Sequence, residues 1–526
     1  MANRSEDLNK NYRRVQVLLF VVACLGFAIV LCFTRFGLGA TGDSVHYLMG
    51  TQNLLSGNGY SRTSGGGEIR PITMAPPFYS IVMSAVGLID KDILGGVRIF
   101  QAFLFGASIF LVGWIIFRYS RSVWASLFGA ATMLMTSNLI KHYGWVLTEA
   151  LYLILLLLAV YCFALYFDTR KRYLVLLSGF LIGFTTITRY VGASLAAAAV
   201  VSILIFLRSS WRQKLVDSLV LFAAWVAPVS LWFVRNVAIG GSVANREVSF
   251  HPMAVDLIRA YRAEISFWFV PAELGFPHGL RKIIMIILGL VGPAFFFLLE
   301  IRDRVLKKIQ RDDPFWILPW FLTLHMIFYA AAIYLTLTFT DAVTDFNVVP
   351  RYLIPIYVSA VILYTIVFHR LIYRRQARLI PRVVLTSIGL CLVFLYAHQS
   401  LSLLRDPIPQ IGYLGFIEQE PDITAKIQAI DGSVSVISND PEMFYVIANR
   451  PAYVLPIQFD FVVGKEREDF QQQIEATIDR LDQGGMIVVF TPMFEGEKEV
   501  INLLNVNLLH QDSRTQFYGY PEAIAE

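Results

Sequence analysis

Long apolar runs separated by short polar connectors fill most of the chain. A helix that crosses a bilayer needs about 20 mostly apolar residues. On this pattern we predict an all-α polytopic membrane domain over residues 1–402. Its eleven predicted transmembrane helices cover 15–34, 97–117, 122–139, 149–168, 173–187, 191–207, 216–236, 283–300, 315–338, 352–372 and 382–402.

The pattern changes after residue 402. Short apolar runs of the strand type alternate there with helical patterns, and the segment is acidic. Such alternation is typical of an α/β domain. We therefore predict a small α/β domain over 403–526. Its expected strands are 433–437, 452–456 and 486–490, and its expected helices are 441–448, 466–481 and 496–504.

The overall composition supports a membrane protein. Hydrophobic residues make up 56% of the chain and charged residues only 16%, whereas soluble domains carry about 25% charged residues. The net charge of +5 is small, and the cations lie in connectors rather than along one face. This distribution argues against nucleic acid as a partner and favours a lipid bilayer.

The short apolar segment 76–89 decides the topology. As a helix it is about 20 Å long, against a hydrocarbon core of about 30 Å, so we predict that it lies on the membrane surface. The N-terminus and five connectors, which together hold half of the 44 Lys and Arg residues, then share one side. By the positive-inside rule that side is cytoplasmic. We therefore expect a plasma (inner) membrane protein with a cytoplasmic N-terminus and an extracytoplasmic C-terminal domain.

The first outer loop, residues 35–96, contains the candidate catalytic acid. Asp43 directly precedes an amphipathic helix predicted over 44–55. One interpretation makes Asp43 the N-cap of this helix. The other makes it a general base that takes a proton from an attacking hydroxyl. His46 and Tyr47 follow closely and are candidates for the same substrate cavity.

Glu149 opens the predicted span 149–168 at the outer side of the membrane. It is either an interfacial carboxylate paired with Lys141, or a second acid that faces Asp43. In the second case it orients a cation or holds a divalent metal. Carboxylate oxygens from two loops suit magnesium or manganese, so Asp43 and Glu149 are a candidate metal site and a divalent cation is a candidate cofactor.

Two arginines stand at the outer ends of spans, each followed by a tyrosine: Arg189 in ITRY and Arg351 in VVPRYLIP. An Arg-Tyr pair can be a plain membrane anchor. A guanidinium is also suited to phosphate, because its planar fork donates two hydrogen bonds to two oxygens. Arg70 is a further candidate for binding the phosphate, and Tyr352, Lys141 and His142 are candidates for lining the cavity. Arg70, Lys141 and His142 could equally be solvated loop residues.

The order of the motifs GDSVHYL, APPFYSIVMSAVGLI, GVRIF, TEALYL, ITR and RYLIP resembles the GT-C superfamily of polyprenyl-phosphate-sugar glycosyltransferases. It is most similar to the branch with the protein O-mannosyltransferases and the lipid A aminoarabinose transferases, which are glycosyltransferase families 39 and 83. The resemblance implies a GT-C-like fold, with juxtamembrane helices in the first outer loop.

The resemblance also implies an activity. A sugar would pass, with inversion, from a dolichyl- or undecaprenyl-type phosphate donor to a hydroxyl acceptor on the outer face. Asp43 corresponds to the catalytic acid of the family, Glu149 to its second acid, and Arg70 and Arg351 to phosphate contacts. Ser44 stands where the mannosyltransferase branch carries the second member of an Asp-Glu pair. The acceptor, which could be a glycan, a lipid or a protein, therefore stays open.

Three other functions compete with this one. A membrane-anchored structural or assembly protein would have a large outer domain and few spans, and this chain has the reverse ratio. A polysaccharide polymerase or ligase also uses lipid-linked glycans, but it would rely on arginines of a large outer loop, here Arg259 and Arg262 in 237–281. A transporter would place polar residues near the middle of the membrane. Here the charged candidates gather at one face, which favours the transferase.

Overall fold

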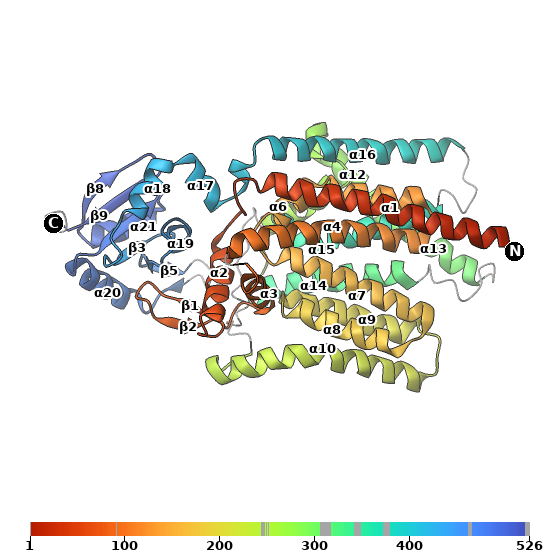
Figure 1. Cartoon of the computed structure of the whole chain (residues 1–526), viewed down its shortest axis with the longest axis horizontal. Coiled ribbons are helices and arrows are strands. Elements are labelled where there is room, and N and C mark those ends of the chain that lie inside the picture. The colour runs from red at the N-terminus through yellow and green to blue at the C-terminus, as the bar shows by residue number, and fades with distance from the viewer. Residues whose placement is uncertain are drawn as a thin grey trace.

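A computed structural model describes the chain except residues 1, 91, 244–247, 249, 251, 306–316, 341–348, 372–378, 461–464 and 521–526. Two basic connectors of the topology prediction, and most of the outer connector 339–350, fall on residues outside this description. An elongated helical bundle and a smaller α/β domain lie end to end (Figure 1). The N-terminus lies at the end of the bundle that is farthest from the α/β domain.

Eight helices of the described part are long and apolar enough to cross a membrane. The fold class predicted from the sequence, a polytopic helical protein with a small α/β domain, is confirmed. The eight are α1 (Ala2–Phe33), α4 (Ile93–Ser120), α7 (Glu149–Thr169), α10 (Trp211–Gly240), α12 with α13 (His278–Ile286 and Gly292–Val305), α14 (Ile317–Phe339), α15 (Val349–His369) and α16 (Leu379–Arg405).

Three further predicted spans take a different form. The predicted span 122–139 covers α5 (Val123–Leu134) and only the start of α6 (Ser137–Tyr143), and these two helices meet at an angle of 61°. α8 (Arg172–Thr186) and α9 (Ala193–Phe206) are apolar but shorter than the eight long helices. α8 and α9 still pack within the bundle, against α7, α10 and α14.

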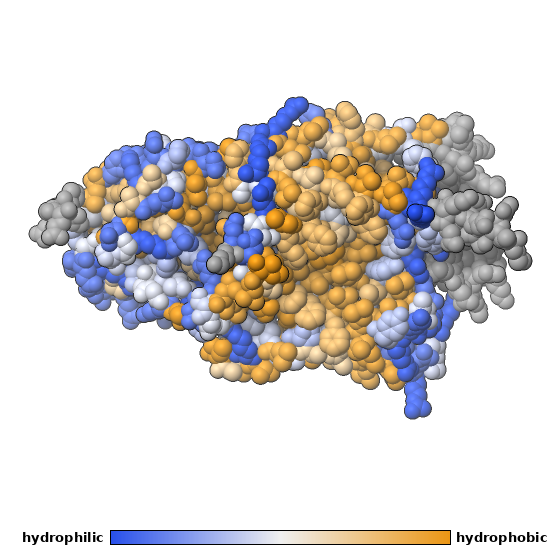
Figure 2. All heavy atoms as spheres, viewed as in Figure 1, coloured by the Kyte–Doolittle hydropathy of each residue, from blue (hydrophilic) through white to orange (hydrophobic). Residues whose placement is uncertain are grey.

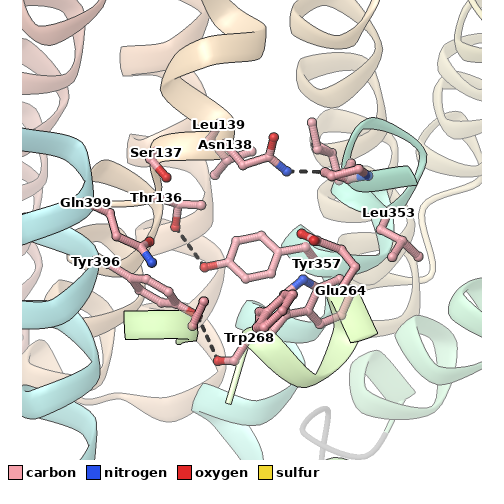
Figure 3. A pocket seen from close by; sticks show the side chains of 14 residues that line it. Thr136, Ser137, Asn138, Leu139, Glu264, Trp268, Leu353, Tyr357, Tyr396 and Gln399 are labelled. Atoms are coloured by element: carbon pink, nitrogen blue, oxygen red, sulfur yellow. Dashed lines mark hydrogen bonds between the residues drawn. The ribbon is translucent and has the colours of Figure 1, made fainter. Parts of the chain in front are cut away.

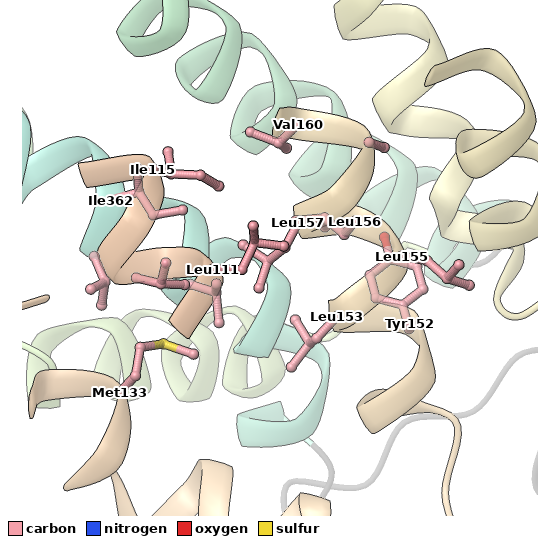
Figure 4. Packing of buried hydrophobic residues seen from close by; sticks show 14 of the residues in the cluster. Leu111, Ile115, Met133, Tyr152, Leu153, Leu155, Leu156, Leu157, Val160 and Ile362 are labelled. Atoms are coloured by element: carbon pink, nitrogen blue, oxygen red, sulfur yellow. The ribbon is translucent and has the colours of Figure 1, made fainter. Parts of the chain in front are cut away.

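The centre of the bundle is built around α7. This helix is apolar around its whole circumference, as a helix buried on all sides must be. Leu156 and Leu157 of α7 belong to the same buried cluster as Leu111 and Ile115 of α4 and Ile362 of α15, which lie on the Leu157 side of α7 (Figure 4). At the periphery, a band of hydrophobic residues covers the bundle, and hydrophilic residues bound it at both ends (Figure 2). This belt is the surface that lipid would cover.

Two short helices separate the bundle from the α/β domain. α2 (Gly42–Leu55) runs across the bundle axis, and α3 (Phe78–Gly87) lies beside it (Figure 1). Ser80 Oγ of α3 donates to the carbonyl of Tyr47 in α2 over 3.0 Å. α3 is about 15 Å long, too short to cross a bilayer, as predicted for 76–89. The glycine-rich turn between them forms a hairpin of β1 (Ser61–Thr63) and β2 (Ile69–Pro71).

The C-terminal domain is a five-stranded mixed sheet with the order β4-β3-β7-β9-β8. Helices pack on both faces, because successive side chains of β3 and β7 point to opposite sides: Val436 and Val488 join one core, Ile437 and Ile487 the other. The strands are β3 (Val436–Ser438), β4 (Tyr453–Val454), β7 (Met486–Phe490), β8 (Asn507–Gln511) and β9 (Thr515–Gly519); the main helices are α17 (Tyr413–Gln419), α18 (Pro421–Gln428), α19 (Pro441–Ala448), α20 (Phe470–Asp482) and α21 (Glu495–Leu503).

The C-terminal domain is joined to α2 by backbone and side-chain contacts. The amide of Tyr413 donates to the carbonyl of Ala40 over 3.0 Å, just before α2 begins. Gly412, the residue before Tyr413, adopts φ +60°, and a Cβ atom on it would lie 2.2 Å from the carbonyl oxygen of Ala40. Farther along, Tyr445 Oη of α19 donates to Gln52 Oε1 of α2 over 2.5 Å. Contacts on two sides therefore fix the position of α2.

Candidate active site

The start of α2 determines where the Asp43 carboxylate points. The N-cap is Thr41, and Ser44 Oγ accepts a hydrogen bond from the Thr41 amide over 3.0 Å. The interpretation of Asp43 as the N-cap is therefore wrong. Because Ser44 is fully buried and takes part in this capping, the carboxylate of Asp43, in the first turn, is left to interact with other elements. The presence of serine at position 44 is thus explained by its part in capping α2.

Arg351 joins the two carboxylates that the sequence singled out. Its Nη1 lies 2.6 Å from Asp43 Oδ2, and its Nε lies 2.5 Å from Glu149 Oε1. Arg189 also donates to Glu149 Oε1. The pairing of Glu149 with Lys141 is therefore wrong, and the carboxylate instead orients two guanidinium groups. Asp43 is 54% exposed and Glu149 2% exposed, so only Asp43 is open to a substrate.

The surroundings set the ionisation of the α2 side chains. Burial opposes ionisation of Asp43, but the charge and hydrogen bond of Arg351 outweigh it and hold the pKa of Asp43 below its usual value. Burial and the nearby Arg62 lower the pKa of His46, so this imidazole is neutral at pH 7. Burial raises the pKa of Tyr47 to about 12. At neutral pH, Asp43 is therefore the ionised base candidate of this helix.

A cavity of about 490 Å³ opens beside Asp43. Its polar groups come from distant elements: β1, α2, the residue before α7, the α8–α9 connection, α14 and the first turn of α15. Segment 71–76, after the β hairpin, forms one wall. Six predicted residues line it together, namely Asp43, His46, Tyr47, Arg189, Arg351 and Tyr352. Arg189 also lies over the Tyr352 ring, 5.6 Å from its centroid.

Four predicted residues lie outside this lining. One of them, Glu149, contacts the lining residues Arg351 and Arg189, and the other three lie elsewhere. Arg70 extends from β2 and pairs with Glu68, 2.6 Å away, and both side chains are 63% exposed. Lys141 donates to Gln410 Oε1 over 3.4 Å, next to the C-terminal domain. His142 is buried, and its Nδ1 lies 2.7 Å from the carbonyl of Asn138. The structure therefore brings none of the three to the cavity.

The structure adds residues that the sequence analysis missed. Arg62, directly opposite Arg70 in the hairpin, lines the cavity. Arg235, at the outer end of α10, donates to the carbonyls of Ile72 and Tyr60 over 2.8 and 2.7 Å. Its neighbour Asn236 donates to the carbonyl of Thr73 over 2.9 Å. These two side chains hold the cavity wall by its backbone. The sequence did carry a signal for these two residues, since adjacent Arg and Asn residues end an otherwise apolar span.

The predicted divalent metal does not fit these residues. Arg351 lies between the carboxylates of Asp43 and Glu149 and donates to both. A metal ion bridging them would have to displace this guanidinium, and two arginines already neutralise the buried Glu149. Within the described ranges, no group of three or more His, Cys, Asp and Glu side chains is placed to hold a metal.

Comparisons with known proteins address the fold. No family model and no curated protein match the chain. Among solved structures, it is similar to ArnT from Cupriavidus metallidurans in the apo state, with a TM-score of 0.59 at 14% identity over 97% of this chain and 98% of that one. The chain has the GT-C fold. The resemblance inferred from the order of the motifs is thereby confirmed at the level of the fold.

A second structure of the same protein carries a ligand. ArnT bound to undecaprenyl phosphate gives a TM-score of 0.55 at 14% identity, over 95% of this chain and 97% of that one. At this identity the likeness concerns the path of the chain. The GT-C fold places the first loop, the start of α7 and the end of α15 at one end of the bundle.

Proposed function

We propose that the protein is an integral-membrane glycosyltransferase. It moves a sugar from a polyprenyl-phosphate donor to a hydroxyl acceptor on the outer face of the plasma membrane. The single observation that carries this proposal is the contact between the exposed carboxylate of Asp43 and Arg351, beside the second arginine Arg189, at the mouth of one cavity. A base and a phosphate-binding fork within one hydrogen bond of each other are what displacement of a phosphate requires.

The reaction follows from these positions. Asp43 accepts the proton of the acceptor hydroxyl as its oxygen attacks the anomeric carbon. The new glycosidic bond forms as the bond to the phosphate oxygen breaks on the opposite face, and the anomeric configuration inverts. The leaving polyprenyl phosphate gains negative charge, which Arg351 and Arg189 stabilise by charge-assisted hydrogen bonds. Glu149 keeps both guanidinium groups oriented toward the cavity.

The Asp43–Arg351 contact also implies an order of binding. Nη1 of Arg351, which now contacts Asp43, is the group that a donor phosphate would engage. Phosphate binding would then release the Asp43 carboxylate and raise its basicity, because the positive charge of Arg351 would be paired with the phosphate instead. We infer that the donor binds before the acceptor. The ArnT structure bound to undecaprenyl phosphate supports a donor of this chemical class.

Replacement of Asp43 tests the proposal. Purified protein in detergent is supplied with a radiolabelled polyprenyl-phosphate sugar and a pool of candidate acceptors, and label transfer is counted. We expect Asp43→Asn to fold, retain the donor and lose at least about 100-fold in rate, the usual contribution of a general base. Glu68→Asn, an exposed acid of the same loop, serves as the control and should remain active. Normal transfer by Asp43→Asn ends this assignment.

The polymerase or ligase alternative depends on arginines elsewhere. Arg259 lies on α11 (Val255–Phe267), where it pairs with Asp256 over 2.6 Å, and both side chains are largely exposed. Neither Arg259 nor Arg262 lines the cavity beside Asp43. The transferase therefore remains the better-supported function. Loss of transfer in an Arg259→Gln, Arg262→Gln variant, with Asp43→Asn active, would reverse this preference.

A further inference from the structure

A second cavity lies on the other side of α15. It has a volume of about 190 Å³, and its walls come from α6, α11, α15 and α16 (Figure 3). Pro350, Leu353 and Tyr357, spaced as one face of a helix, line this cavity, whereas Arg351 and Tyr352 line the first. The first turn of α15 therefore lies between the two cavities, with side chains directed to each. The second cavity is distinct from the site of the proposed transfer.

The walls of the second cavity are held by hydrogen bonds of their own. Tyr357 Oη lies 2.8 Å from Thr136 Oγ1, and Tyr396 Oη donates to the carbonyl of Trp268 over 2.7 Å. Asn138 Nδ2 is directed to the carbonyl of Pro350 over 3.3 Å. The ring of Trp268 meets that of Tyr357 edge to face, with centroids 5.2 Å apart. These contacts engage the tyrosine hydroxyls and leave aromatic rings facing the space.

Glu264 is the acid of this cavity. Its side chain extends from α11 into the space beside Tyr357 (Figure 3). Among the residues that the structure describes, no ion pair or hydrogen bond of this carboxylate occurs, and burial raises its pKa. No lysine or arginine lines the cavity. A half-buried carboxylate without a counter-charge is costly, so the cavity is complementary to a ligand that brings a positive charge and N–H donors.

We propose that this cavity binds a ligand ammonium group, held by the Glu264 carboxylate and by the ring faces of Trp268 and Tyr357. The carboxylate supplies a charge-assisted acceptor, and electron-rich aromatic faces attract cations, quaternary ammonium groups included. An anionic headgroup is excluded, because its charge would meet Glu264. The proposal is independent of the transferase activity, since none of these residues lines the cavity beside Asp43.

The depth of the cavity indicates a lipid headgroup as the source of the amine. Tyr396, on the wall, lies nine residues before the end of α16 at Arg405, which is about 13 Å along the helix. That end of α16 is adjacent to the C-terminal domain (Figure 1). The cavity therefore lies at the level of the lipid headgroups and upper chains. A free amine of the same chemistry is the other possible source.

Native mass spectrometry of the full chain tests the proposal. The protein is incubated with equal amounts of phosphatidylethanolamine, phosphatidylcholine and phosphatidylglycerol, and the bound fraction of each lipid is compared. We expect retention of an amine lipid over phosphatidylglycerol, and a preference about ten-fold weaker in Glu264→Gln, since a hydrogen bond to a charged group contributes that much or more. Asp256→Asn, on the same helix outside the cavity, should behave as the wild type.

Two further measurements complete the test. Trp268→Phe keeps the acid but reduces the aromatic face, and it should weaken the preference less than Glu264→Gln does. Thermal unfolding with free ethanolamine identifies the source: protection by ethanolamine without lipid selectivity supports a soluble amine at the same site. Equal retention of phosphatidylglycerol and the amine lipids without ethanolamine protection, or an unchanged preference in a folded Glu264→Gln variant, overturns the proposal.

Discussion

Arg351 Nη1 lies 2.6 Å from Asp43 Oδ2, and 307 residues of chain separate the two side chains. The same guanidinium reaches Glu149 through its Nε. One arginine therefore connects the first outer loop, the start of α7 and the outer end of α15. Any substitution at this position acts on all three, and this connection underlies the first prediction.

Replacement of Arg351 by glutamine should change both donor affinity and pH dependence. Without the guanidinium, burial is the dominant remaining influence on Asp43, so its pKa rises. Because the base acts only when ionised, activity is lost as pH falls through this pKa. The acidic limb of kcat/KM, which reports the free enzyme, should therefore move to higher pH. The KM for the donor should rise about ten-fold, the loss of one charge-assisted contact.

The control for this variant is Arg70→Gln. Arg70 pairs only with the exposed Glu68 among the described residues, and exposed pairs contribute roughly 0–1 kcal/mol. The resemblance to the family assigns Arg70 to the phosphate, so this variant also tests that assignment. We expect an unchanged KM and pH profile. A donor KM raised as much in Arg70→Gln as in Arg351→Gln would contradict the position of the phosphate site.

Arg235 should position the cavity wall without touching substrate. Its guanidinium binds the carbonyls of Tyr60 and Ile72 and lies over the Trp232 ring, 5.0 Å from its centroid. Arg235→Gln should leave the buried carbonyl of Ile72 unpaired, at a cost of about 1–3 kcal/mol, whereas the carbonyl of Tyr60 still accepts from the Ile72 amide. We expect a lower melting temperature and a raised donor KM, with kcat changed less and the pH profile unchanged. Arg212→Gln, exposed at the opposite end of α10, is the matched control.

Gly412→Ala should loosen the contact between the bundle and the C-terminal domain. The residue has φ +60°, and a Cβ atom would lie 2.2 Å from the carbonyl oxygen of Ala40. Strain of this kind costs on the order of 1–3 kcal/mol. We expect faster proteolysis between α16 and α17 and a lower melting temperature. Gly432→Ala, which would meet no atom within 4 Å, should leave both unchanged.

Removal of divalent ions should leave transfer intact. The Arg351 guanidinium donates to one oxygen of each carboxylate, Asp43 Oδ2 and Glu149 Oε1, and it occupies the position that a metal ion bridging the two would need. Activity is measured after dialysis against EDTA and again after addition of magnesium or manganese. Loss of activity on dialysis, followed by recovery with either ion, would show that a metal enters the site and displaces the arginine.

The sequence was most informative about the apolar helices and about which residues share one end of the bundle. Runs of about 20 apolar residues, and the contrast between basic and cation-poor connectors, identified the helices and placed Asp43, Glu149, Arg189 and Arg351 at one face. These signals come from the bilayer, which imposes length and charge rules on each segment separately. The structure brings those four residues together.

The remaining features depend on tertiary contacts. Arg62 and Arg70 lie in the same loop with similar neighbours, and only the hairpin register decides which one reaches the cavity. Asp43 precedes an amphipathic pattern in the manner of an N-cap, but the helix begins earlier and Thr41 caps it. Strands β8 and β9 were missed because NLLHQ and TQFYG show little apolar alternation. Their pairing with each other and with β7 defines them.

The double attachment of α2 has a consequence for any shortened form of the protein. The helix that carries Asp43 rests on the bundle on one side and on Tyr413 and Tyr445 on the other. A chain cut after α16 would keep every apolar helix and every arginine of the pocket, yet its reactive carboxyl would lose part of its scaffold. The C-terminal domain is thus part of the support of the proposed site rather than a dispensable accessory.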